Sequence, residues 1–360
     1  MKRWMAVLLL LAALPALAHP PEDRLAMLRH GVNITGWFRF PASRDPAALA
    51  AWMSDAAMAD LRRAGFGFVR LAMDPAELEI PSVREAAVTA VCRFQRQGLA
   101  VVVDAHPNDW HLETEPADRS RLRAFWRAMA PALRRCDPRM TMPEVLNEPV
   151  FPGDPAGWAA LQHTILADIR TALPDSTIVL TGHDWGSIAG LLALTPEADG
   201  NVVYSFHFYD PAELTALAAY RPNLDRAALS RLPFPATDRA ACDAVASGSA
   251  DPPTRDLMHF YCGLGWDGSA ITRRIDAAAS WARNHGVALL AGEFGATAAL
   301  NPSARLAWLE TVRRGLDARG IGWALWGYDD IMGFAVPRPP VNKPLLDDNV
   351  LRVLGVSKMR

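Results

Sequence analysis

The sequence of 360 residues has few of the signals that mark metal, nucleotide or nucleic-acid proteins. It contains only 4 cysteines, and no CxxC pair is among them, which argues against a zinc site. An HExxH helix and a GxSxG elbow are both absent, so neither a zinc-protease motif nor an α/β-hydrolase motif is present. The formal net charge is only −2, so nothing points to nucleic acid or an anionic membrane as a partner.

Three short patterns resemble known motifs but fall in unsuitable places. Residues 263–268 match GxGxxG, yet no apolar strand precedes them, so dinucleotide binding is not expected. The glycosylation sequon at Asn33 lies inside a predicted strand, where a glycan would not fit. His183 and Asp184 have metal-ligating side chains, but nothing nearby completes a coordination shell. We therefore expect no metal and no cofactor.

The longest apolar run lies at the start of the chain. Lys2 and Arg3 precede an apolar stretch over residues 4–17, and Ala16 and Ala18 are the small residues that signal peptidase prefers. A membrane anchor is the alternative, but a span needs roughly 20 apolar residues. We predict a signal peptide over residues 1–18 and a mature domain over 19–360, secreted or periplasmic and independent of the membrane.

Export would permit disulfides, and four cysteines allow three pairings. We favour Cys92–Cys136 and Cys242–Cys262, which pair neighbours along the chain. An unstrained bridge in the second pair would contribute on the order of 3 kcal/mol by closing its loop.

The mature sequence alternates short apolar runs with longer amphipathic segments. Glycines such as Gly98 and Gly286 follow helical segments just before the next strand, as helix C-caps do. The runs predict eight buried strands at residues 31–38, 67–73, 99–104, 142–147, 177–181, 201–206, 287–293 and 321–326. The segments between them predict helices at 54–64, 82–97, 119–135, 155–172, 269–285 and 303–319.

Eight alternating strands and helices fit either a (β/α)8 TIM barrel or a doubly wound open sheet, and the count of eight favours the barrel. One long interval, residues 210–272, separates the sixth strand from the seventh. We interpret it as an elaborated loop over the active face, with a short helix near 212–219. A small disulfide-stapled subdomain away from the site is the alternative. No internal repeat and no linker to an appended binding module is apparent.

Polar and aromatic residues gather at one end of six of the predicted strands. The carboxyl ends of barrel strands form the catalytic face, so these side chains should meet in a cleft. Glu148 and Glu293, after the fourth and seventh strands, would face each other, and glycoside cleavage needs such a pair of carboxyl groups. A structural ion pair with an arginine is the alternative for either one alone. The full set is Arg70, His106, Asn147, Glu148, His207, Tyr209, Glu293 and Trp326.

This set resembles glycoside hydrolase family 5, the cellulase-type members of the (β/α)8 glycosidase clan. The tripeptide of Asn147, Glu148 and Pro149 is its most specific element, and the resemblance spans residues 31–326. It implies a retaining hydrolase of β-linked polysaccharide, first of all an endo-β-1,4-glucanase. A β-mannanase or an exopolysaccharide-directed enzyme is the alternative on the same scaffold. A non-catalytic glycan-binding protein is the alternative of another class, but such a protein would be expected to have lost one carboxylate.

The resemblance also implies roles. Glu148 would be the acid/base and Glu293 the nucleophile, kept ionised by Arg70 and Tyr209. Asn147 would bind the sugar 2-hydroxyl, and Trp326 would form the floor under the sugar at the cleavage point. The two histidines of the set, His106 and His207, would bind hydroxyls or tune Glu148.

Tryptophan is abundant, with 12 residues against 5 tyrosines, and a sugar cleft could use several of them. Four aromatic residues near predicted strand ends, Trp37, Trp110, Trp185 and Tyr328, are candidates for neighbouring subsites, and packing beneath a loop is the alternative. We expect a monomer that binds polysaccharide or oligosaccharide.

Overall fold

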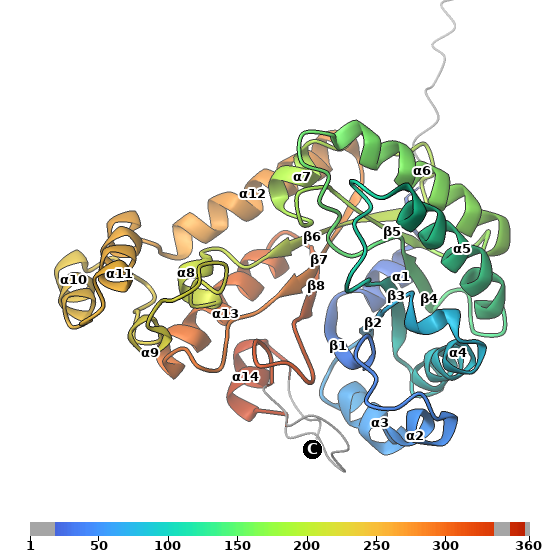
Figure 1. The fold of residues 1–360 in the computed structure, drawn as a ribbon, viewed down its shortest axis with the longest axis horizontal. Helices are drawn as coiled ribbons and strands as arrows, with labels where there is room; N and C mark the ends of the chain where they lie inside the picture. The colour runs from blue at the N-terminus through green and yellow to red at the C-terminus, as the bar shows by residue number, and fades with distance from the viewer. Residues whose placement is uncertain (1–18, 335–345, 357–360) are drawn as a thin grey trace, which may run out of the picture.

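The computed structural model describes residues 19–334 and 346–356, so the predicted signal peptide lies outside the described residues. Eight parallel strands pair in chain order and close into a barrel with helices around it (Figure 1). The (β/α)8 prediction is therefore confirmed. The strands are β1 (His30–Phe38), β2 (Phe68–Met73), β3 (Ala100–Ala105), β4 (Thr141–Glu144), β5 (Ile178–Thr181), β6 (Val202–Phe208), β7 (Ala288–Phe294) and β8 (Gly322–Leu325).

Six of the helices that cover the barrel (α3, α4, α5, α6, α12 and α13) lie close to the predicted ranges, and α1, α2, α7 and α14 were not predicted. Several begin at an aspartate or asparagine cap, as α6 does at Asp154 and α13 at Asn301, and α12 ends at the left-handed Gly286. The covering helices are α1 (Glu22–Met27), α2 (Pro46–Ala51), α3 (Asp55–Arg63), α4 (Pro81–Arg96), α5 (Pro116–Leu133), α6 (Pro155–Ala172), α7 (Ile188–Leu192), α12 (Gly268–His285), α13 (Pro302–Asp317) and α14 (Asp348–Val353), with a 3-10 turn η1 (Glu77–Glu79).

The lower part of the barrel interior is filled by apolar side chains. Phe68, Val102, Met142 and Leu290 point inward from four strands and are fully buried. A Cβ atom on Gly31 would lie 2.2 Å from the Phe68 ring, so only glycine fits at that position. The floor of the barrel is thus a packed core, and space for a ligand remains only above it.

Strand register brings the polar residues of the upper barrel to a common level. Asn33 on β1 is the register partner of Arg70 on β2, and His207 on β6 is the partner of Glu293 on β7. β4 ends at Glu144, earlier than predicted, so Asn147 and Glu148 lie on the turn that follows it. The backbone N–H of Asn147 donates to the carbonyl of Ala105 over 2.8 Å, which ties this turn to the end of β3.

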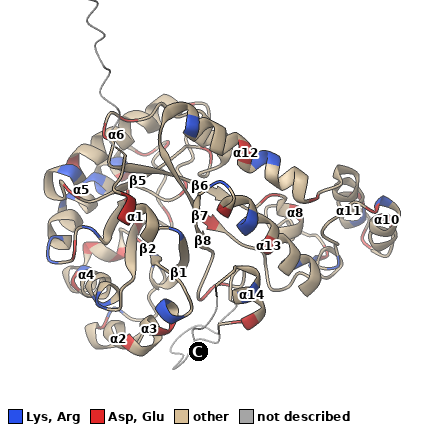
Figure 2. Ribbon diagram, turned by 180° about the vertical axis from the view of Figure 1, so that it is seen from behind, with Lys and Arg blue, Asp and Glu red and all other residues tan. Residues whose placement is uncertain are grey.

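The long interval after β6 contains four helices, α8 (Ala212–Thr215), α9 (Arg226–Leu229), α10 (Arg239–Ser247) and α11 (Pro252–Leu264). The predicted short helix is α8, although it is shorter than expected. Figures 1 and 2 show α10 and α11 at the end of the molecule, beside the barrel. None of residues 210–272 lines the cavity at the barrel mouth, so the predicted cover over the active face is wrong. The reason is that α10 and α11 pack on each other, where the Cys242–Cys262 bridge joins them, and bury apolar side chains such as Ala246 and Met258.

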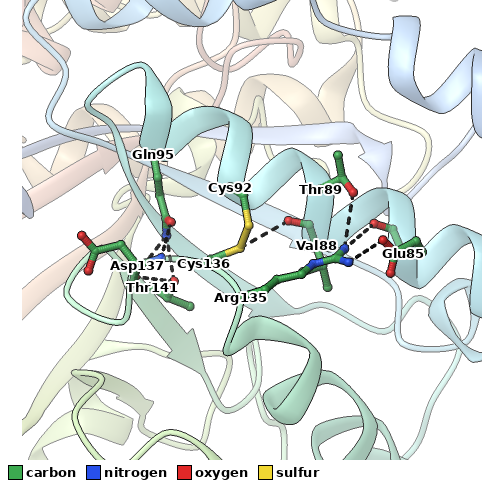
Figure 3. Close-up of a disulfide and its surroundings, with 9 residues drawn as sticks. All are labelled: Glu85, Val88, Thr89, Cys92, Gln95, Arg135, Cys136, Asp137 and Thr141. Atoms are coloured by element: carbon green, nitrogen blue, oxygen red, sulfur yellow. Dashed lines mark hydrogen bonds and ion pairs between the residues drawn. A yellow bond between two sulfur atoms is a disulfide. The ribbon is translucent and has the colours of Figure 1, made fainter.

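Both predicted disulfides are present. Cys242–Cys262 joins α10 to α11, and Cys92–Cys136 joins α4 to the turn that follows α5. Figure 3 shows the Cys92–Cys136 bridge beside Gln95. The side-chain amide of Gln95 donates to the Thr141 hydroxyl at the start of β4 over 2.7 Å. Within residues 19–334 and 346–356, no helix is both long and apolar enough to cross a membrane.

Candidate active site

A cavity of about 460 Å³ opens at the carboxyl ends of the strands. This volume lies in the range of ligand sites, roughly 300–1,000 Å³. The predicted site residues that line it are His106, Asn147, Glu148, Trp185, Tyr209, Glu293 and Trp326, and the subsite candidate Trp110 also lines it. Arg70 and His207 lie behind this wall, 0% and 6% exposed.

Glu293 is almost enclosed, with 3% of its surface exposed. Arg70 donates from Nη1 to its Oε1 over 2.6 Å, and the Tyr209 hydroxyl donates to its Oε2 over 2.8 Å. Burial and the negative charge of Glu293 raise the pKa of Tyr209 well above its usual value, so the hydroxyl keeps its proton. Two fixed donors therefore face this carboxylate.

Arg70 is surrounded by acceptors on every side of its guanidinium. Nε and Nη2 bond to Glu144 over 2.6 and 3.0 Å, and Nη2 also bonds to Asn147 over 2.9 Å. Nη1 bonds to Asn33 over 3.0 Å, and Asp104 lies 3.1 Å from Nη2. Burial alone would lower the pKa of Arg70, but the surrounding carboxylates raise it well above its usual value. The cation behind the cavity is thus permanent and fixed.

Sequence reasoning missed Asp104 and Glu144, although both were visible as carboxylates inside apolar runs. Burial raises the pKa of Asp104 to about 6, against the opposing effect of Arg70. Burial also raises the pKa of Glu144. An isolated carboxylate is costly to bury, so its presence in a strand implies a cation nearby.

Glu148 has a more open environment, with 31% of its side chain exposed. Its Oε1 lies 2.8 Å from Nδ1 of His207, the one hydrogen-bond partner of its side chain among the described residues. Burial lowers the pKa of His207, but the charge of Glu293 and the contact with Glu148 outweigh it and raise that pKa.

Three side chains of the site have potential metal-ligand atoms that lie within 4.8 Å of one another, those of Glu148, His207 and Glu293. These atoms already engage each other and Tyr209. The arrangement therefore fits a pair of acting carboxyl groups better than a coordination shell.

His106 and Trp326 form one wall of the cavity. Nδ1 of His106 lies 2.8 Å from Oδ2 of Asp104, and its ring centroid lies 5.7 Å from that of Trp326. Burial lowers the pKa of His106 well below its usual value, so the ring is neutral. Trp326 follows the last residue of β8 and exposes only 9% of its surface, toward the cavity.

Trp185 stands at the rim of the cavity and is 56% exposed. Asp184 and Trp185 both adopt left-handed backbone angles, with φ of 60° and 55°. Such angles cost a non-glycine residue on the order of 1–2 kcal/mol. The backbone N–H groups of these residues donate to the carbonyls of Val150 and Pro149 over 3.1 Å, which fixes the turn against the loop that carries Glu148.

Two other aromatic predictions were wrong. Trp37 is 1% exposed and does not line the cavity, because its indole donates to the carbonyl of Leu49 over 2.9 Å behind β1. Tyr328 is 5% exposed and also does not line the cavity. Alternation along a strand sends neighbouring side chains to opposite faces, and Trp37 lies on the helix-facing side.

Sequence reasoning also missed Arg39, the residue that follows the first strand. Arg39 comes directly after β1 and lines the cavity. Its Nε donates to Oδ1 of Asn108, another cavity residue, over 2.9 Å. The signal was available, because a charged residue directly follows the first predicted strand, as polar residues follow the others.

The family model of cellulase, described as glycosyl hydrolase family 5, matches residues 30–330. The chain belongs to glycosyl hydrolase family 5. It is therefore a glycoside hydrolase, acting on β-glycosides, and the resemblance seen in the sequence is confirmed.

Relatives of this family 5 chain carry endoglucanase names. Endoglucanase C of Acetivibrio thermocellus is 23% identical over 342 residues, which is 90% of this chain and 98% of that protein. Endoglucanase 3 of Fibrobacter succinogenes is 24% identical over 340 residues, 85% of this chain but only 50% of that protein. The chain thus spans about half the length of Endoglucanase 3.

Solved structures share the fold. The endoglucanase Cel5A of Thermotoga maritima superimposes with a TM-score of 0.73 at 21% identity, covering 93% of this chain and 99% of that one. The cellulose synthase subunit Z of Clostridioides difficile gives 0.71 at 21% identity, with 91% and 99% covered. At these identities the likeness concerns the barrel itself.

Proposed function

We propose that this chain is a retaining endo-β-1,4-glucanase in which Glu293 is the nucleophile and Glu148 the acid/base. The observation that carries the proposal is the closeness of the two carboxyl groups, with one oxygen of each within 4.8 Å of the other. Retaining glycosidases hold their carboxyl groups about 5–5.5 Å apart, whereas inverting ones leave about 6.5–9.5 Å for a water.

In the first step Glu293 attacks the anomeric carbon, and the glycosidic C–O bond breaks. The hydrogen bonds from Arg70 and Tyr209 favour the charged carboxylate and aim it from behind. The leaving oxygen takes a proton from Glu148, so no free alkoxide is released. A covalent glycosyl ester on Glu293 and a neutral leaving sugar result.

In the second step Glu148 works in the opposite direction. It takes a proton from a water molecule, and the oxygen of that water attacks the anomeric carbon and displaces Glu293. The partial exposure of Glu148 suits this exchange, because water must reach it from the cavity. Two displacements at one carbon restore the original β configuration.

Other cavity residues would position the sugar. Oδ1 of Asn147 accepts from Arg70, which turns its amide N–H groups toward the place of the sugar 2-hydroxyl. Trp326 is placed to lie under the sugar at the cleavage point, and the exposed ring of Trp185 offers a platform for a more distant sugar.

The β-1,4-glucan substrate is supported by the endoglucanase names of the relatives. A β-mannan is the second candidate, because Thermotoga maritima Cel5A has been solved with cellobiose and with mannotriose. A non-catalytic glycan-binding role fits less well, since both carboxyl groups and their partners are intact.

We further propose that residues 1–18 are removed on export and that the enzyme works as a monomer outside the cytoplasm. The two disulfides support export, because such bonds persist in oxidising compartments. Amino-terminal sequencing of the exported protein should begin at His19. An uncleaved amino terminus would contradict the signal peptide.

The substrate proposal is tested by reducing-end release from soluble β-glucans, β-mannans and xylans. We expect the highest kcat/KM on β-1,4-glucan, with a rapid fall in viscosity that marks internal cleavage. A higher kcat/KM on mannan would make the enzyme a β-mannanase. The release of only short products at constant viscosity would contradict the endo mode.

A further inference from the structure

Arg39 gives the cavity a positive charge that the proposed mechanism does not use. It follows β1 directly, and its side chain lines the cavity together with His106 and Asn108. Arg70, the other arginine of the site, is sealed behind the wall and bound to carboxylates. Among the described residues that line the cavity, Arg39 is the only lysine or arginine.

The guanidinium of Arg39 is held in place from one edge. Its Nε donates to Oδ1 of Asn108 over 2.9 Å, and Nδ2 of Asn108 donates to Oδ2 of Asp74 over 2.9 Å. The Arg39 guanidinium carbon also lies 4.7 Å from the ring centroid of Phe40. Asn108 thus couples Arg39 to a buried aspartate, and the Phe40 ring supports one face of the planar group.

The outer edge of the same group has no partner. Within residues 19–334 and 346–356, Nη1 and Nη2 of Arg39 make no hydrogen bond, and no carboxylate forms an ion pair with them. The exposed Arg44, by contrast, forms an ion pair with Glu77 over 2.6 Å. Burial lowers the pKa of Arg39, yet guanidinium keeps its charge in proteins. The charges of Asp104, Glu293 and Glu148 act on Arg39 from a distance and favour its charged form, but none of these carboxylates bonds to it, so its outer edge can still pair with a carboxylate.

We propose that Arg39 binds a carboxylate carried by the glycan, so that the preferred substrate is an acidic β-glycan. The planar fork of two N–H donors matches a carboxylate in a bidentate pair. The cation would also offset the repulsion that Glu148 and Glu293 exert on a negatively charged chain entering the site. This inference rests on the proposed function and adds the substrate's charge to it.

The competing explanation is that Arg39 bonds to neutral sugar hydroxyls. Two soluble ethers of the same β-1,4-glucan separate the cases, because carboxymethyl cellulose is anionic and hydroxyethyl cellulose is neutral. The quantity measured is the ratio of kcat/KM on the anionic polymer to kcat/KM on the neutral one, at matched chain length and degree of substitution. Loss of hydroxyl contacts lowers both values together, whereas loss of a charge contact lowers the ratio.

We expect Arg39→Gln to lower this ratio about tenfold, the effect of one lost charge-assisted hydrogen bond. Arg39→Lys should lower the ratio less, because lysine keeps the positive charge but lacks the planar pair of N–H donors. Salt at roughly 0.5 M should lower the wild-type ratio, because it screens the attraction to Arg39, and should raise that of Arg39→Gln, in which only the repulsion from Glu148 and Glu293 is left to be screened. Arg44→Gln, which removes an exposed and already paired arginine, is the matched control and should keep the wild-type ratio.

A ratio that Arg39→Gln leaves unchanged would overturn the inference without touching the proposed hydrolase, because both polymers would still be cleaved. A wild-type enzyme that cleaves neither polymer would instead defeat the proposed function. In that case affinity electrophoresis in gels containing each polymer still tests Arg39. Retardation by the carboxymethyl polymer that Arg39→Gln abolishes would support the carboxylate site, and equal mobility of the two proteins would refute it.

Discussion

Glu293 and Glu148 face each other across the barrel mouth in opposite surroundings. Glu293 is 3% exposed and accepts hydrogen bonds from both Arg70 and Tyr209. Glu148 exposes 31% of its side chain and contacts His207. One carboxyl group is clamped by fixed donors, and the other is left open to the cavity.

This contrast fits the two different chemical roles that we propose for one residue type. A nucleophile must stay charged and point at one atom, so fixed donors and low exposure suit it. An acid/base must gain and lose a proton in each cycle, so contact with the cavity suits it. The surroundings of each glutamate, and not its sequence context alone, therefore support the proposed roles.

The largest expected effect is at Glu293. Glu293→Gln removes the nucleophile and should lower kcat on a β-glucan by at least about 10⁴-fold, since no covalent intermediate can form. Steady-state hydrolysis assays measure this. The control is Glu310→Gln on α13, a partly exposed glutamate that does not line the cavity, which should keep wild-type activity. Retention of even a tenth of the activity would remove Glu293 from the mechanism.

Glu148→Gln should be less severe and should depend on the leaving group. General acid–base catalysis contributes about 10²–10⁴-fold, so we expect a loss of that order on a β-glucan. A dinitrophenyl glycoside needs no protonation of its leaving group, so glycosylation of Glu148→Gln should stay fast and the covalent intermediate should accumulate. A burst of dinitrophenol shows this. An equal loss on both substrates would break the proposed contrast between the two glutamates.

The strand and helix positions could be predicted because each strand is a short apolar run and each helix an amphipathic segment, and neither signal needs knowledge of packing partners. The strand-end residues could be predicted because a parallel barrel brings all its carboxyl ends together. The cage around Arg70 could not, since Asp104 and Glu144 meet it only through the register of β2, β3 and β4. Two further features could not be predicted, because they also depend on long-range packing. They are the face of β1 on which Trp37 lies and the outward course of residues 210–272.

Replacing Arg70 tests the surroundings of Glu293 through the stability of the protein. Arg70→Met leaves three buried carboxylates, those of Asp104, Glu144 and Glu293, without their cation. Breaking a buried pair costs about 3–5 kcal/mol, so the free energy of unfolding in urea should fall by that amount. Arg44→Met, which breaks an exposed pair with Glu77, should cost under about 1 kcal/mol. Equal stability of the two variants would mean that the carboxylates around Arg70 are protonated and do not need it.

The smallest expected effect is a pH dependence from His207, between the two glutamates. Its pKa in the folded protein is raised above the ordinary value, so its contribution to stability is complete below a pH of about 6.5 and is lost as the pH rises through the folded pKa. Urea unfolding of wild type and His207→Gln across this range measures the difference. The advantage of the wild type should shrink as pH rises. An advantage that grows with pH would reverse the assigned shift.

The most direct test of the two roles is covalent trapping. A 2-deoxy-2-fluoro β-glycoside with a good leaving group slows the second displacement more than the first, so the sugar stays on the nucleophile. Peptide mass spectrometry of the inactivated enzyme should find the added sugar on Glu293. A label on Glu148 or on any other residue, or an α-configured product in the NMR spectrum of a normal turnover, would contradict the retaining mechanism.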